Sequence, residues 1–117
     1  MQFIEYPKCS TCIKAKKFLV ECGIDFDDRN IKLNNPTKEE LKKWHLLSGL
    51  PLKKLFNTSG LIYKDLGLSQ KLATMSEEEQ FELLSSNGML VKRPILVLDN
   101  KAYFGFKKEE REKELRK

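Results

Sequence analysis

Cys9-Ser10-Thr11-Cys12 is the stretch of this 117-residue chain that decides its fold. It stands between an apolar segment, Gln2 to Tyr6, that predicts a strand, and Ser10 to Cys22, whose apolar residues recur at helical spacing. A thiol at a helix start lies near unpaired backbone N–H groups and the positive end of the helix dipole, which favour the thiolate. A cysteine three residues later lies about one turn away on the same side of the helix. The sequence therefore predicts Cys9 as a nucleophile and Cys12 as the thiol that resolves its adduct.

Other interpretations of the cysteine pair are weaker. A zinc site would need a second ligand pair, but only Cys22 and His45 remain, and their spacing is not that of a pair. A structural disulfide is disfavoured because Met1-Gln2 runs directly into a short strand pattern without the apolar region of a secretory signal, so we expect a reduced, cytoplasmic protein. Two core cysteines that meet the CxxC spacing by chance are the simplest alternative. The helical spacing predicts Cys22 on the buried stripe and His45 as a surface or half-buried helix residue.

Composition narrows the class of protein. With 117 residues and 40% hydrophobic content, the chain suits one domain with a modest core, and no apolar run approaches transmembrane length. The net charge is +5, but the basic residues are interspersed with acidic ones rather than gathered in an aromatic-flanked stripe. We therefore expect a monomer with no metal, no membrane and no direct nucleic-acid partner. A positive surface still favours encounter with an anionic substrate or an acidic protein.

Strand patterns at both ends enclose a helical middle. Asp25 to Ile31 predicts a second strand, after a helix stop at Gly23. Residues 35–87 are predicted to be a helical insert, since Thr37-Lys38-Glu39-Glu40 and Ser76-Glu77-Glu78-Glu79 both match the capping box and Asn87-Gly88 is a helix terminator. In the first of these helices the pattern places Leu41, Trp44 and either Leu46 or Leu47 inward. The core would then comprise residues 1–34 and 88–117, with strands at Pro94 to Leu98 and Ala102 to Phe106 and a charged final helix at Glu109 to Lys117.

Arg93-Pro94 is the second stretch with chemical interest. Pro94 opens the predicted central strand, where a missing N–H is tolerable, and an X-Pro bond at such a bend is a candidate for the cis form. If the fold brings this bend beside the CxxC helix, the Arg93 guanidinium would lower the pKa of the nearby sulfur. It would also offer two parallel hydrogen bonds to an oxyanion.

The order of strand, CxxC helix, strand, helical insert, Arg-Pro-Ile, hairpin and final helix resembles the thioredoxin-like (glutaredoxin-like) fold of the arsenate reductase (ArsC) family, which also contains the Spx-type regulators. The resemblance covers nearly the whole chain. Residues 6–19 are similar to the family's active-site stretch, residues 92–95 to its second signature, and residues 63–68 to the end of its insert. It implies an α/β fold with a four-stranded mixed sheet and a helical insertion.

The same resemblance implies a set of site residues. Cys9 falls on the catalytic cysteine and Arg93 on the arginine that contacts the oxyanion. Substrate-binding positions that follow from the alignment are Lys8, Ser10, Thr11, Arg93, Pro94, Asn57 and Lys107.

Several of these positions depart from the glutaredoxin-coupled arsenate reductases. Those enzymes have arginines where Asn57 and Lys107 stand, and a histidine shortly before the cysteine, where this chain has Tyr6-Pro7-Lys8. They also lack a second cysteine at the position of Cys12, which resembles instead the redox pair of the Spx-type proteins. Residues 55–60 are more similar to a branch of small ArsC-like proteins than to either class.

Two hypotheses about function follow. In the first, the protein is an ArsC-like thiol-disulfide oxidoreductase that needs no bound cofactor, and thioredoxin or glutathione with glutaredoxin resets its Cys9–Cys12 pair. In the second, it is an Spx-type redox-sensing regulator that binds the RNA polymerase alpha subunit. The short charged tail, residues 107–117, offers no long docking extension and favours the enzyme. The sequence leaves open the physiological substrate, the reductant and whether arsenate is reduced.

Overall fold

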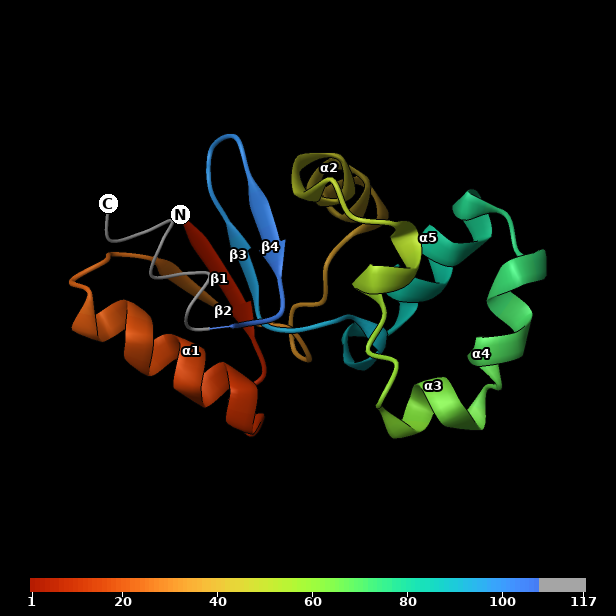
Figure 1. The fold of residues 1–117 in the computed structure, drawn as a ribbon, viewed down its shortest axis with the longest axis horizontal. Helices are drawn as coiled ribbons and strands as arrows, with labels where there is room; N and C mark the ends of the chain where they lie inside the picture. The colour runs from red at the N-terminus through yellow and green to blue at the C-terminus, as the bar shows by residue number, and fades with distance from the viewer. Residues whose placement is uncertain (108–117) are drawn as a thin grey trace.

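One four-stranded mixed sheet organises the protein, whose computed structural model describes residues 1–107 (Figure 1). The strands are β1 Gln2–Glu5, β2 Asp27–Asn30, β3 Ile95–Val97 and β4 Ala102–Phe104, in the order β2-β1-β3-β4. β1 pairs with β2 in parallel, while β3 runs antiparallel to both β1 and β4. The predicted four-stranded mixed sheet is therefore confirmed. The final helix predicted at Glu109 to Lys117 lies outside the described residues.

Helix α1, Ser10–Glu21, covers one face of the sheet (Figure 1). Its predicted apolar stripe is buried, and Ala15 and Leu19 pack against Phe3 of β1 and Leu96 of β3. The helix ends as expected at Gly23, which has a left-handed φ of 70°. The prediction for Cys22 was wrong in degree: this residue is only half-buried, because it is the C-cap at the very end of α1, beyond the last buried residue of the stripe, Leu19.

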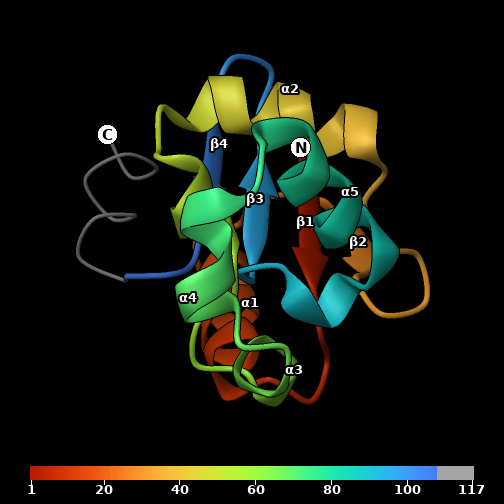
Figure 2. The same cartoon turned by 90° about the vertical axis from the view of Figure 1, so that its right-hand side faces the viewer.

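The insert helices lie on the opposite side of the sheet, as the view from that side shows (Figure 2). They are α2 Lys38–Ser48, η1 Leu52–Leu55, α3 Leu61–Asp65, α4 Leu68–Lys71, η2 Leu72–Thr74, α5 Glu77–Ser86 and η3 Gly88–Leu90. Both predicted capping boxes are present, at the starts of α2 and α5. Leu47 packs against the larger core, whereas Leu46 is 81% exposed. Sequence reasoning missed α4 and the last two 3-10 helices because each is too short to show a period.

A short antiparallel contact ties the insert to the segment that leads into β3. Phe56 and Val91 form an isolated bridge, flanked by hydrogen bonds from Asn57 N to Leu90 O (2.7 Å) and from Lys92 N to Leu55 O (2.8 Å). The Arg93-Pro94 peptide bond, which follows this contact in the chain, is cis, as the sequence predicted. This arrangement fixes the backbone of Arg93 between the insert and the sheet. Within residues 1–107, none of the helices has the length and apolar character needed to cross a membrane.

Candidate dithiol site

The two cysteines of the CxxC stretch differ in exposure. Cys9 is the half-buried N-cap of α1 and keeps an extended backbone, with φ −85° and ψ 123°. Its N–H donates to Tyr6 O at 2.9 Å, and its carbonyl accepts from Ile13 N at 3.0 Å, which starts the helix. Cys12 lies in the first turn and is fully buried. An incoming group would therefore meet Cys9 first.

The Cys9 thiol has a pKa below its ordinary value of 9.0. Burial raises this pKa, but hydrogen bonds from the Cys12 backbone N–H and thiol, and from the Thr11 backbone N–H, outweigh burial. The positive charge of Arg93 acts in the same direction. The first turn of α1 thus stabilises a thiolate at Cys9 in the way that helix starts stabilise anions.

The Cys12 thiol shows the opposite shift. Burial is the largest cause and raises the pKa of Cys12 to about 12, assisted by the neighbouring Cys9 sulfur. A hydrogen bond from the Tyr6 backbone and the charge of Arg93 lower it only in part. One thiol of the pair is therefore prepared to ionise while the other keeps its proton.

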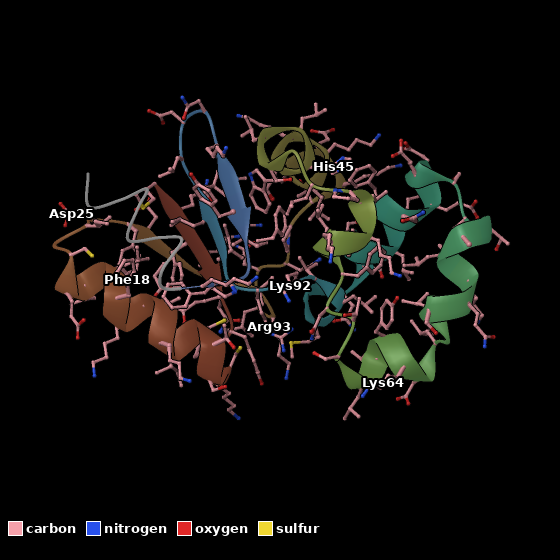
Figure 3. The ribbon with its side chains drawn as sticks, viewed as in Figure 1. Phe18, Asp25, His45, Lys64, Lys92 and Arg93 are labelled. Atoms are coloured by element: carbon pink, nitrogen blue, oxygen red, sulfur yellow. The ribbon has the colours of Figure 1, made fainter. Side chains whose placement is uncertain are left out.

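Arg93 lies between the N-terminal end of α1 and the insert helices (Figure 3). Its Nη1 donates to Met89 O at 3.3 Å, and its guanidinium carbon lies 5.5 Å from the centre of the Tyr6 ring. Its Nε is buried and has no hydrogen-bond partner among residues 1–107. Because the Tyr6 carbonyl also accepts the Cys9 N–H, the contact between Arg93 and the Tyr6 ring places the bend beside the CxxC helix. The charge of Arg93 lowers the pKa of both Cys9 and Cys12.

The other sequence-predicted site residues take up different places. Lys8, Ser10 and Thr11 are exposed around the start of α1, and Pro94 is buried next to Arg93. Asn57 is half-buried, and its Oδ1 accepts a hydrogen bond from Ser59 Oγ at 3.3 Å within its own loop. Lys107 is exposed, two residues beyond Gly105, whose N–H donates to Pro94 O. Within the described part of the chain, neither Asn57 nor Lys107 has a hydrogen bond or an ion pair to the dithiol.

Sequence reasoning missed the buried carboxyl group of Glu5. Glu5 is 3% exposed, and because strand residues alternate in direction, its side chain shares the α1 side of the sheet with Phe3. Its Oε2 lies 3.4 Å from Lys16 Nζ, which also binds Asp28 Oδ2 at 2.5 Å. Burial, followed by the nearby Asp28 carboxylate, raises the pKa of Glu5 to about 7. The available signal was a carboxyl residue directly after the apolar pair Phe3 and Ile4 of the strand Gln2–Glu5.

We expect Glu5→Gln to make the protein more stable at about pH 8. A folded pKa of about 7 against 4.5 means that Glu5 favours folding below pH 4.5, and that this contribution is lost as the pH rises towards 7. The free energy of unfolding lost in this way is at most about 3 kcal/mol, because the Lys16 ammonium group can move closer to the ionised Glu5. Asp28 does not offset this loss of stability between pH 4.5 and pH 7. Burial raises the pKa of Asp28, but hydrogen bonds from Glu5 and Lys16 outweigh burial and keep that pKa below its ordinary value of 3.8.

Urea unfolding at several pH values tests this expectation. The free energy of unfolding of the wild type should fall between about pH 5 and pH 8, whereas that of Glu5→Gln should change less. Asp25→Asn, at an exposed position, is the matched control and should keep the wild-type slope. A parallel pH dependence in Glu5→Gln and wild type would show that Glu5 ionises normally.

The fold and the dithiol together define a class. A β1-α1-β2 unit joined to an antiparallel β3-β4 hairpin, with a CxxC pair at the start of α1, is a thioredoxin-like protein. The ArsC family model matches residues 4–113, and the chain belongs to this family. The resemblance seen in the sequence is thereby confirmed. Within residues 1–107, His, Cys, Asp and Glu side chains form no group of three placed to hold a metal ion.

Relatives of this chain include both an uncharacterized protein and regulators. It is 51% identical over 110 residues to the uncharacterized protein YusI of Bacillus subtilis, covering 94% of this chain and 93% of YusI. It is 33% identical over 106 residues to the regulatory protein MgsR of the same organism, covering 91% and 82%. It is 30% identical over 102 residues to the global transcriptional regulator Spx 2 of Bacillus anthracis, covering 87% and 76%.

Solved structures place the same fold in proteins related to arsenate reductase. An ArsC family related protein from Bacteroides fragilis is 59% identical, with a TM-score of 0.92 over 96% of this chain and 94% of that chain. The arsenate reductase from Vibrio cholerae is 25% identical, with a TM-score of 0.84 over 98% of each chain. The predicted thioredoxin-like fold class is confirmed by these similarities.

Proposed function

We propose that this protein is a thiol-disulfide oxidoreductase in which Cys9 is the nucleophile and Cys12 the resolving thiol. The observation that carries the proposal is the opposite shift of the two pKa values, lowered at Cys9 and raised to about 12 at Cys12. A reductase of this kind needs one thiolate that attacks and one thiol that stays protonated until an adduct has formed. Exposure supports the same order, since only Cys9 of the pair is accessible.

The reaction proceeds in two exchanges. Cys9 thiolate attacks one sulfur of a substrate disulfide, forming a mixed disulfide and releasing the other substrate sulfur as a thiolate that takes up a proton. Cys12 then loses its proton and attacks the Cys9 sulfur, which releases the second substrate thiol and leaves a Cys9–Cys12 disulfide. Two electrons pass to the substrate. Reduced thioredoxin, or glutathione with glutaredoxin, supplies two electrons and two protons that convert the Cys9–Cys12 disulfide back to two thiols. The proposal therefore includes a reducing compartment such as the cytoplasm.

Arg93 would assist the first exchange. Its charge lies close enough to lower the pKa of Cys9, and its buried Nε has no partner among residues 1–107. A guanidinium in this place favours both the attacking thiolate and an anionic leaving group. Lys8, Ser10 and Thr11 are exposed around the start of α1 and belong to the proposed substrate surface, while the buried Pro94 would support Arg93 beneath it.

Arsenate is expected to be a poor substrate. The family resemblance implies anion-binding arginines where Asn57 and Lys107 stand, and each lost charge-assisted hydrogen bond costs about 1.5–3 kcal/mol. Two losses correspond to a rate at least about 10²-fold lower. We expect the double variant Asn57→Arg/Lys107→Arg to raise arsenate reduction while leaving disulfide reduction within about twofold. Efficient arsenate turnover by the wild type would show that the two replaced arginines are not needed here.

A second candidate function is redox-controlled regulation. MgsR and Spx 2, at 33% and 30% identity, are named as regulators. In this alternative, oxidation of the same cysteine pair changes a surface that binds the RNA polymerase alpha subunit. Both functions use the dithiol, so only a partner or a turnover measurement separates them.

One set of assays tests the proposed function. Purified protein would be given NADPH with thioredoxin and thioredoxin reductase, or glutathione with glutaredoxin and glutathione reductase. Disulfide substrate or arsenate would be added, and NADPH consumption measured. In parallel, immobilised purified alpha subunit would be tested for binding the reduced and the oxidised protein. Multiple turnovers of the disulfide with either reductant support the oxidoreductase; no turnover together with redox-dependent binding to the alpha subunit supports the regulator.

A further inference from the structure

Arg93 is half-buried, with its Nε fully covered, yet few polar contacts hold it. A guanidinium carries five N–H donors, yet the one hydrogen bond that Arg93 makes among residues 1–107 is from Nη1 to Met89 O, at 3.3 Å. The ion pairs of the described chain join other residues. By contrast, Arg29 makes four hydrogen bonds, two of them to Glu40. The orientation of Arg93 must therefore come largely from packing.

Tyr6 supplies that packing. Its ring centre lies 5.5 Å from the Arg93 guanidinium carbon, a distance at which an aromatic face attracts a cation. The ring is half-buried and packs against the larger core, which includes Ile4, Val91 and Ile95. It is thus a fixed platform rather than a mobile surface ring.

The backbone of Tyr6 contacts both cysteines of the pair, Cys9 through its backbone N–H and Cys12 through its thiol. Its carbonyl accepts the N–H of Cys9 at 2.9 Å, and its backbone donates a hydrogen bond to the Cys12 thiol. One residue therefore contacts all three groups of the proposed dithiol site: Cys9, Cys12 and Arg93. Because of these contacts, a shift of the CxxC turn would move the Tyr6 ring, and the Arg93 guanidinium that packs against the ring would move with it.

We propose that Tyr6 is a positioning residue that holds the Arg93 guanidinium against its ring and thereby fixes the arginine charge beside the dithiol. This inference rests on the proposed function of that dithiol. A ring on one face of the guanidinium leaves its N–H edge open, and the buried, unpartnered Nε lies on that edge. The edge is then available to an anionic group at Cys9, either the thiolate itself or a leaving group.

The test uses three replacements of Tyr6. Tyr6→Phe keeps the ring face, Tyr6→Leu removes it but keeps an apolar side chain, and Tyr6→Met is a second ring-free variant if the leucine variant does not fold. The rate of Cys9 alkylation is followed by mass spectrometry from about pH 5 to pH 9. We expect Tyr6→Leu or Tyr6→Met to lower the rate at neutral pH by about 2- to 10-fold by raising the pKa of Cys9, and Tyr6→Phe to match the wild type.

A double-mutant cycle separates positioning from a general structural effect. In an Arg93→Met background, loss of the ring should cause no further decrease in alkylation, because the charge it positions is absent. An equal decrease in both backgrounds, or no decrease in either, would overturn the proposal.

An independent measurement does not depend on thiol chemistry. The Nε–H proton resonance of Arg93 should move when the ring is removed, because an aromatic face shifts nearby protons, and should stay in place in Tyr6→Phe. An unchanged resonance in Tyr6→Leu would overturn the positioning role. If instead Cys9 proves unreactive in the wild type while this resonance responds to the ring, the oxidoreductase proposal fails and the placement of Arg93 by Tyr6 stands.

Discussion

Cys9→Ser is expected to lower disulfide reduction about 10³-fold or more, to the level of the uncatalysed exchange. Serine is nearly isosteric with cysteine, but its hydroxyl does not form a nucleophilic anion at neutral pH. Cys12→Ser should behave differently: its Cys9 thiolate still attacks, but the mixed disulfide persists because no resolving thiol follows. Steady-state turnover separates both variants from the wild type, and mass spectrometry of the trapped adduct separates them from each other.

The matched control is Cys22→Ser. Cys22 lies at the far end of α1 from the dithiol and should be replaceable with little change in turnover. In the wild type, alkylation at neutral pH should label Cys9 far faster than Cys12, whose pKa is about 12. Mild oxidation should join Cys9 to Cys12. A dominant bond between Cys12 and Cys22, or equal labelling of all three cysteines, would contradict the assignment.

Much of the fold was predictable because its signals are local. The apolar stripe of α1, the left-handed stop at Gly23 and the two capping boxes each depend on residues within a few positions of one another. Strands β1 and β3 were visible as short apolar runs. The position of Cys9 and Cys12 at a helix start followed from the same local pattern, and so did the lowered pKa of Cys9. The raised pKa of Cys12 was not predicted, because its largest cause is burial.

The unpredicted features of the site depend on contacts between distant segments. Tyr6 and Arg93 are 87 positions apart in sequence by their numbering, and no local pattern pairs them. The burial of Glu5 depends on α1 and β2 closing over it, with Lys16 and Asp28 at its edge. Asn57 was assigned to the substrate surface by resemblance alone, and this assignment stays a prediction; its side chain accepts a hydrogen bond from Ser59 within its own loop.

Gly88 follows the end of α5, as predicted, but the physical reason for glycine at this position differs from the predicted one. The sequence placed a helix terminator at Asn87-Gly88, and α5 does end at Ser86. However, Gly88 does not adopt the left-handed conformation that favours glycine at such ends. A Cβ atom at Gly88 would lie 2.0 Å from Ile31 O and 2.9 Å from Ile31 C. Glycine is required here because two backbone segments, one after β2 and one before β3, approach each other closely.

We therefore expect Gly88→Ala to lower the free energy of unfolding by about 3 kcal/mol or more, since a contact of 2.0 Å with backbone can be relieved only by moving one segment. Gly23→Ala is the control: its φ is +70°, but no atom lies within 4 Å of the added Cβ, so only backbone strain of about 1–2 kcal/mol applies. Urea unfolding of both variants measures the difference. Equal losses would mean that the approach of Gly88 to Ile31 is not tight.

Gly88→Ala should also change the reactivity of the dithiol. Gly88 opens η3, and the next residue, Met89, supplies the carbonyl that accepts the Arg93 hydrogen bond. Displacement of this segment weakens one of the two contacts that hold the guanidinium, the other being the Tyr6 ring. Folded Gly88→Ala protein should thus alkylate more slowly at Cys9 at neutral pH, whereas Gly23→Ala should keep the wild-type rate. A destabilised Gly88→Ala protein with unchanged Cys9 reactivity would mean that the ring alone is sufficient to hold Arg93.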